Sequence, residues 1–159
     1  MSLPNISIAT SVRYGNYKQH FDDALFMVHT IVNKYDEIKQ HIHLPRGLSI
    51  HLRPIRSVYG KAYYTTEEKN ERSYRSYWME IDVRQDDETF YDTLLHELVH
   101  IEQFYERRLE DPGIPEHFKW KGKVMEIKSC FLEEYNELPW EKEAIERAEN
   151  LVEIIFKSK

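Results

Sequence analysis

The feature that most constrains this chain is the run HELVH at residues 96–100, an HExxH pattern inside a stretch with helical spacing of apolar residues. On an α-helix, residues four apart lie on one face, about 5–6 Å apart at Cβ. His96 and His100 at that spacing can share one Zn²⁺, and Glu97 beside them can act as general base on a water bound to the metal. The sequence therefore predicts a helix that carries two histidine ligands of a zinc site.

The residues around this pattern, from 86 to 108, favour a buried helix. Asp86 and Asp87 are suitable N-cap residues at its start, and a Pro-Gly turn at residues 111–113 follows its end. Apolar residues cover most of the circumference: Phe90, Leu94, Leu95, Leu98, Val99, Ile101, Phe104 and Tyr105. A polar stripe runs through this apolar surface and consists of Thr89, Asp92, Thr93, His96, His100, Gln103 and Arg107. Burying such a stripe costs several kcal/mol unless its groups are paired or bind a metal. A metal explains this stripe better than two hydrogen-bonded core histidines do.

Composition narrows the class of protein. The chain has 159 residues, most simply one domain over 1–159, and 41% hydrophobic and 13% aromatic residues, as globular domains do. The net charge of −6 argues against a nucleic-acid-binding face. The single Cys130 excludes an intrachain disulfide and fits a reducing compartment. With no apolar run near the roughly 20 residues of a membrane span and no signal-peptide pattern, we expect a cytoplasmic protein without a membrane or nucleic-acid partner.

Hydrophobic periodicity predicts the order of elements along the chain. Residues 1–16 read as irregular, and residues 67–75 read as a solvated loop or hairpin tip. The predicted elements are a helix over 17–43, strands over 48–55, 60–65 and 77–83, the central helix, a helix over 124–135 and a last helix over 139–156. Because three strands fall between two helices without βαβ alternation, we expect an α+β fold with a small antiparallel or mixed three-stranded sheet packed against helices.

A catalytic zinc site normally has three protein ligands, so a third must come from elsewhere in the chain. His117, beyond the Pro-Gly turn, would complete a three-histidine site. Glu141 or Glu143, at the start of the last helix, would complete a site of two histidines and one glutamate. Either glutamate could instead belong to a solvated helix start. The spacing of the residues leaves these alternatives open.

The second half of the chain resembles a known group of proteins. The segments TLLHELVHIEQFY, HFKWKGK and YNELPWEKEA, within residues 93–149, are similar to those of metallopeptidases that bacteriophages often encode and that are grouped near the SprT-like proteins. Members share an HExxH helix followed by Gln, a W-x-G-K segment and a PWE-x-EA helix start. The resemblance implies a minimal zincin-like peptidase domain that uses Zn²⁺.

The resemblance also bears on the third ligand. Larger HExxH-plus-Glu peptidases, the gluzincins, carry E-x-x-A-D in the last helix, and its first Glu binds the metal. Glu141 matches that position, with Ala144 in the place of the Ala. The chain departs at Ile145, where an Asp would orient a ligating histidine. That role is then unfilled, or filled by another residue such as Asp92 or Glu143.

SprT-like proteins in the strict sense use a third histidine ahead of a Phe. His117-Phe118 matches this pattern only in part, because the Gly that usually follows the His is missing. The resemblance therefore implies Glu141 as the third ligand ahead of His117 or Glu143.

The leading hypothesis is a zinc-dependent hydrolase of the HExxH class that cleaves a peptide (amide) bond in a protein or peptide substrate. His96, His100 and Glu141 would hold Zn²⁺, and Glu97 would take a proton from the metal-bound water and deliver it to the leaving amine. Tyr135 is the predicted donor to the developing oxyanion.

Other roles remain alternatives at this point. His117 could replace Tyr135 as the oxyanion donor, and the strand over 77–83 could be the edge to which an extended substrate adds. A different class of function is a non-catalytic zinc-binding regulatory or protein-interaction module. The presence of Glu97 favours catalysis, because a purely structural zinc site has no need of a base.

Overall fold

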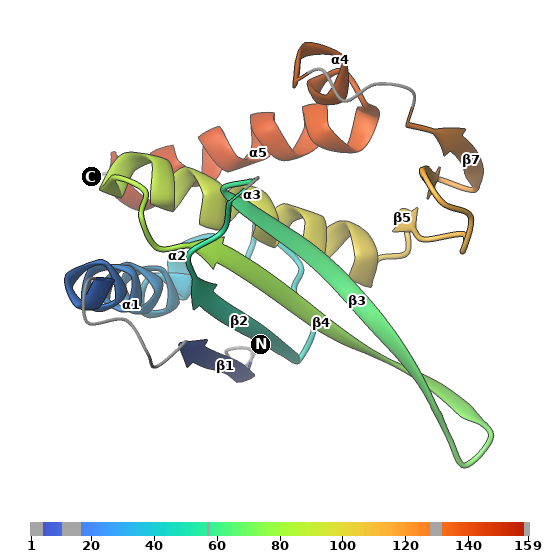
Figure 1. The fold of residues 1–159 in the computed structure, drawn as a ribbon, viewed down its shortest axis with the longest axis horizontal. Coiled ribbons are helices and arrows are strands. Elements are labelled where there is room, and N and C mark those ends of the chain that lie inside the picture. Colours follow the sequence, from blue (N-terminus) through green and yellow to red (C-terminus); the bar gives the residue numbers. More distant parts are fainter. Residues whose placement is uncertain (1–4, 11–16, 57, 128–131, 158–159) are drawn as a thin grey trace.

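The structure, a computed structural model, describes residues 5–10, 17–56, 58–127 and 132–157. It is an α+β fold in which a mixed four-stranded sheet and a small antiparallel sheet pack against α3 and α5 (Figure 1). The predicted fold class is confirmed. The elements are β1 (Asn5–Thr10), α1 (Lys18–Asn33), α2 (Tyr35–Ile38), β2 (Gly47–Arg53), β3 (Gly60–Lys69), β4 (Arg72–Asp82), α3 (Asp87–Tyr105), β5 (Leu109–Glu110), β6 (His117–Trp120), β7 (Lys123–Glu126), α4 (Leu132–Asn136) and α5 (Pro139–Phe156).

The larger sheet has the strand order β1-β2-β4-β3, with β1, β2 and β4 parallel and β3 antiparallel to β4. The prediction that the first 16 residues are irregular is wrong for β1, where Ile6 and Ile8 pair with Leu48 and Ile50 of β2. Since α1 connects two parallel strands, this part is a βαβ unit, contrary to expectation. The short alternation of apolar and polar residues in NISI was the signal for this strand.

One face of this sheet forms the main core. Along β2 the buried residues Leu48, Ile50 and Leu52 alternate with partly exposed ones, and α1 and α3 cover the buried face with residues such as Val28 and Leu98. Each such side chain contributes about 1.5–3 kcal/mol by leaving water. This packing holds α3 firmly against the sheet. None of the helices in the described ranges is apolar over enough length to cross a membrane.

The opposite face of the sheet is polar. Glu80 of β4 is buried there, and its carboxylate accepts from Arg53 Nε of β2 at 2.6 Å and from Lys61 Nζ of β3 at 2.8 Å. Burial acts to raise the pKa of Glu80, but its hydrogen bonds with Arg53 and Lys61 lower it below the usual value. The carboxylate therefore stays charged and ties three neighbouring strands together.

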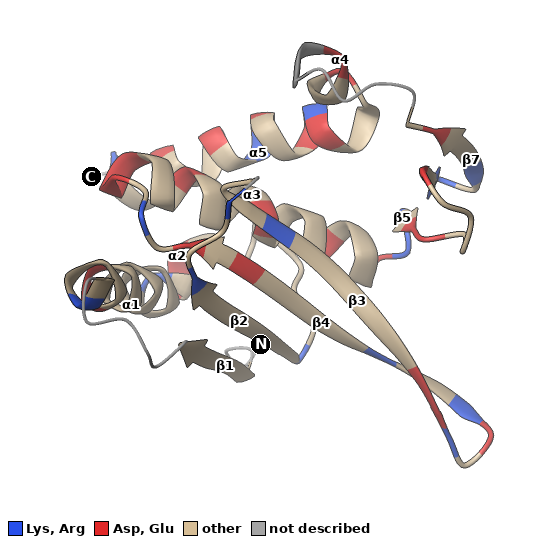
Figure 2. Cartoon of the chain, in the orientation of Figure 1, with Lys and Arg blue, Asp and Glu red and all other residues tan. Residues whose placement is uncertain are grey.

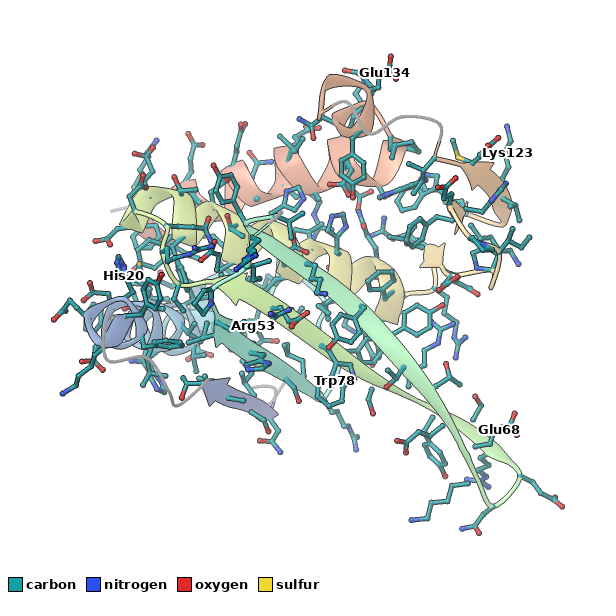
Figure 3. All side chains as sticks on the ribbon, viewed as in Figure 1. His20, Arg53, Glu68, Trp78, Lys123 and Glu134 are labelled. Carbon is teal, nitrogen blue, oxygen red and sulfur yellow. The ribbon has the colours of Figure 1, made fainter. Side chains whose placement is uncertain are left out.

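The paired strands β3 and β4 extend past the end of β2 as a two-stranded arm, with Glu68 close to its end (Figures 1 and 3). Residues 67–75, predicted as a solvated loop or hairpin tip, form the tip of this hairpin, and most of them are strand. The turn is only Asn70-Glu71, whose φ angles of 53° and 63° are the left-handed values that two-residue hairpin turns require. Acidic and basic side chains are interspersed along the arm (Figure 2), which protects exposed strand edges from pairing with other chains.

The central helix α3 is confirmed within the predicted range. The Asp86 side chain caps its start by accepting from Thr89 N at 2.9 Å. The helix ends at Tyr105 and not at Arg108, since Arg107 adopts a left-handed φ of 60°. The bond from Arg108 N to the carbonyl of Gln103, at 3.0 Å, closes a Schellman turn. This turn directs Arg108 back toward α5.

The small sheet follows this turn. The W-x-G-K segment is the hairpin between β6 and β7, in which Lys121 and Gly122 have φ angles of 49° and 86°. The predicted helix over 124–135 is wrong at its start, because β7 occupies 123–126 and α4 covers only Leu132–Asn136. Residues 128–131, which include Cys130, lie outside the described residues.

The last helix α5 begins at Pro139 and ends at Phe156, as predicted. Its Trp140 joins Phe104 of α3 and Leu109 of β5 in a second hydrophobic cluster, which also contacts the small sheet. This cluster sets the first turn of α5 next to the middle of α3.

Candidate metal centre

Three side chains converge where α5 packs on α3. His96 and His100 lie one turn apart on α3, and Glu141 is in the first turn of α5. Glu141 Oε1 is 3.1 Å from His96 Nε2, Glu141 Oε2 is 2.8 Å from His100 Nε2, and the two Nε2 atoms are 3.2 Å apart. Among the described residues, this is the group of His, Cys, Asp or Glu side chains whose atoms lie close enough together to hold a metal ion.

The donor set fits a transition-metal ion. In a tetrahedral zinc site with bonds of 2.0–2.2 Å, neighbouring ligand atoms lie about 3.3–3.5 Å apart, close to the 2.8–3.2 Å separations found here. Two imidazole nitrogens and a carboxylate oxygen form a set that zinc prefers. Three protein ligands also leave a fourth position for water or substrate. The three side chains are therefore close enough together to hold one metal ion.

The group is buried and strongly coupled. Burial acts against a charged His100, but the hydrogen bond and the charge of Glu141 raise its pKa to about 9. Burial likewise acts to raise the pKa of Glu141, and its hydrogen bonds with His100 and His96 bring it down to about 2. Without a cation, a proton is thus held between His100 and Glu141. A metal ion bound here would take the place of that proton, so we expect metal binding to weaken as the pH falls.

Glu97 lies beside the two histidines and is 7% exposed. Burial raises the pKa of its carboxyl group above the usual value, with His100 and His96 acting in the opposite direction. A carboxylate whose pKa is raised toward neutral can accept a proton and return it within one reaction cycle. The position and the environment of Glu97 suit the predicted general base.

Tyr135 comes to the same site from α4. Burial, followed by the charges of Glu141 and Glu97 and a hydrogen bond to Glu141, raises the pKa of its hydroxyl group. The hydroxyl therefore stays protonated at neutral pH and can donate a hydrogen bond. The structure thus brings Tyr135, predicted from the sequence as the oxyanion donor, to the carboxylate of Glu141.

Of the three candidates for the third ligand, only Glu141 lies with the histidines. His117 is on β6, where its Nδ1 is 2.8 Å from the carbonyl of Pro115. Glu143 accepts from Arg108 Nη1 at 2.6 and 2.8 Å, so its carboxylate forms an ion pair with Arg108 and does not face the histidines.

Sequence reasoning missed the residue that orients His100. His100 Nδ1 lies 2.8 Å from Oε1 of Gln103, which is fully buried. Asp92, which had been considered for this role, is exposed, and Glu143 contacts Gln103 instead. The signal was present in the sequence, because residues three apart on a helix face each other and Gln103 belongs to the polar stripe of α3.

The prediction that the strand over 77–83 is an edge to which a substrate could add is wrong. Over Trp78–Ile81, β4 pairs with β2 on one side and with β3 on the other. Among the described residues, the edge strand of the larger sheet that contacts α3 is β3.

Comparison with known proteins adds no relative. No protein-family model, no curated protein and no solved structure matches the chain. The resemblance to phage-encoded SprT-like peptidases is therefore not supported by these comparisons. The class that the fold and the site define is an α+β protein in which an HExxH helix and a glutamate from a later helix form a candidate metal centre.

Proposed function

We propose that this protein is a zinc-dependent hydrolase that cleaves peptide (amide) bonds in a protein or peptide substrate. The observation that carries the proposal is the convergence of His96, His100 and Glu141 on one point, with the buried Glu97 beside them. Zinc in such a site lowers the pKa of a bound water and polarises a carbonyl group.

The side chains divide the chemistry between them. Glu97 takes the proton of the attacking water and delivers it to the leaving amine, since its raised pKa suits both steps. Tyr135, which stays protonated, donates a hydrogen bond to the carbonyl oxygen as negative charge develops on it. Tyr135 is hydrogen-bonded to Glu141, and Glu97 lies beside His96 and His100. Both side chains are therefore next to the proposed metal and can act on the same substrate carbonyl group.

A peptide substrate is supported by the position of β3. This strand is at the edge of the sheet and begins at Gly60, whose backbone lies against the side chains of Thr93 and Glu97. An extended peptide that adds to a free strand edge forms main-chain hydrogen bonds along its length. A peptide on β3 would therefore pass beside Glu97.

The proposal is tested first by the metal content of the purified protein, measured by mass spectrometry. We expect about one zinc per chain in the wild type and in His117→Ala, and its loss in Glu141→Ala, because zinc sites of this type need all three ligands. Peptide cleavage should accompany the metal and stop with a chelator. A wild-type protein that takes up no zinc contradicts the proposal, and one that binds zinc but cleaves no peptide is a non-catalytic metal-binding module.

Gly60→Ala is expected to impair catalysis without loss of metal. A Cβ atom at this position would lie 2.8 Å from Thr93 Cγ2 and 3.2 Å from both the carbonyl oxygen of Glu80 and Glu97 Cγ. Thr93 must therefore move, and the Glu97 side chain must give by a few tenths of an ångström. A displacement of this kind lowers the hydrolysis rate by roughly 10- to 100-fold. The control is Gly47→Ala on β2, where the nearest atom, the carbonyl oxygen of Asn5, is 3.6 Å away. Equal rates for the two variants would show that Glu97 tolerates the shift.

A further inference from the structure

Gln103 uses its amide group to connect α3 to α5. Its Oε1 lies 2.8 Å from His100 Nδ1, and its Nε2 donates to the carbonyl of Trp140 at 3.0 Å and to Glu143 Oε1 at 3.3 Å. The side chain is completely buried. An amide in such a place is expensive unless its groups are bonded, and here both ends of the amide have partners.

We propose that Gln103 is a positioning residue that holds His100 and Glu141 in one metal-binding geometry. The inference rests on the proposed metal site. Because Oε1 can only accept, the hydrogen on the imidazole must be on Nδ1, which leaves Nε2, on the side of Glu141, to bind a metal.

Gln103 also holds the backbone next to Glu141. The carbonyl of Trp140 is joined by a peptide bond to the nitrogen of Glu141, so the bond from Gln103 fixes the backbone next to the third ligand. Trp140 itself is packed in the second hydrophobic cluster. One buried amide thus contacts a ligand on α3 and the chain beside a ligand on α5.

The amide of Gln103 is held in one orientation by the groups around its Nε2. Its Nε2 faces the carbonyl of Trp140 and the carboxylate of Glu143, and a rotated amide would place Oε1 against these oxygens. Arg108 Nη1 donates to both oxygens of Glu143, at 2.6 and 2.8 Å, which holds this carboxylate in place as an acceptor for Gln103 Nε2. Arg108 reaches Glu143 because the Schellman turn after α3 directs it there.

The test compares Zn²⁺ affinity and the visible spectrum of the Co²⁺-loaded protein. Gln103→Leu has nearly the size of glutamine but makes no hydrogen bond to His100 or Trp140. We expect roughly 10- to 100-fold weaker Zn²⁺ binding in competition with a chelating dye, and a changed Co²⁺ spectrum. Gln103→Met, which is unbranched, serves as the second variant if Gln103→Leu does not fold.

Ile101→Val is the matched control, because Ile101 is fully buried on the same helix but belongs to the main hydrophobic core. It should keep the wild-type affinity and Co²⁺ spectrum even though it loses a buried methylene group. Wild-type affinity and spectrum in a folded Gln103 variant would overturn the inference and leave the proposed function intact. A wild-type protein that binds neither Zn²⁺ nor Co²⁺ would instead overturn the proposed function.

Discussion

Replacement of Glu97 by glutamine is expected to lower the rate of peptide hydrolysis by roughly 10²–10⁴-fold, the usual contribution of a positioned acid–base group. Glutamine has the shape of glutamate, so the packing of this buried side chain against Gly60 is kept. Its amide cannot accept a proton from water. Steady-state cleavage of a peptide, measured on samples of known zinc content, checks this expectation.

The control for this variant is Glu137→Gln, since the Glu137 side chain is 72% exposed and pairs with Lys142 at the surface. Its activity should equal that of the wild type. Zinc content and circular dichroism of Glu97→Gln should also equal those of the wild type, because Glu97 is not a ligand in the proposed site. Full activity in Glu97→Gln would refute its role as general base.

Glu102→Gln is expected to cost about 2–4 kcal/mol of the free energy of unfolding. Glu102 is a buried carboxylate on α3 that accepts from Arg147, from Arg108 Nη2 at 3.2 Å and from the backbone nitrogen of His43 at 2.5 Å. The loss of its charge removes one of the two carboxylates that Arg108 and Arg147 share, and Glu143 remains as the other. The new amide also presents hydrogen atoms where only an acceptor fits.

Urea unfolding, followed by circular dichroism, measures this effect, and the melting temperature should fall by roughly 5–15 °C for a domain of this size. Glu137→Gln is again the control, because loss of an exposed pair changes the free energy of unfolding by less than about 1 kcal/mol. Equal midpoints for Glu102→Gln and the wild type would mean that the cost of burying these charges cancels their attraction.

Several features of this protein follow from residues close together in the sequence. The extent of α3 around His96 and His100 follows from its apolar periodicity and from the Asp86 cap, and the start of α5 follows from Pro139. These are local effects, because helical spacing and end capping involve residues within one or two turns. The periodicity of α5 even held a signal for Glu141, which is three residues before the buried Ala144 and so on its face.

Errors arose where the partner of a segment lies far away in the chain. Residues 5–10 form a strand only because β2, some 40 residues later, pairs with them. The start of the helix predicted over 124–135 is a different error, because β7 pairs with β6 just before it in the chain, across the turn at Lys121-Gly122. This pairing outweighs the weak helical propensity of a short segment.

The sequence by itself determined that His96 and His100 would lie on one face of a helix, with Glu97 next to His96 in the chain. It left open which of Glu141, Glu143 and His117 would join them. Glu141 and Glu143 are two residues apart and therefore point in directions about 200° apart around α5, and the packing of that helix on α3 decides which of them meets the histidines. Only the tertiary structure decides this, because the contact between α3 and α5 joins residues some 40 positions apart, which no local pattern specifies.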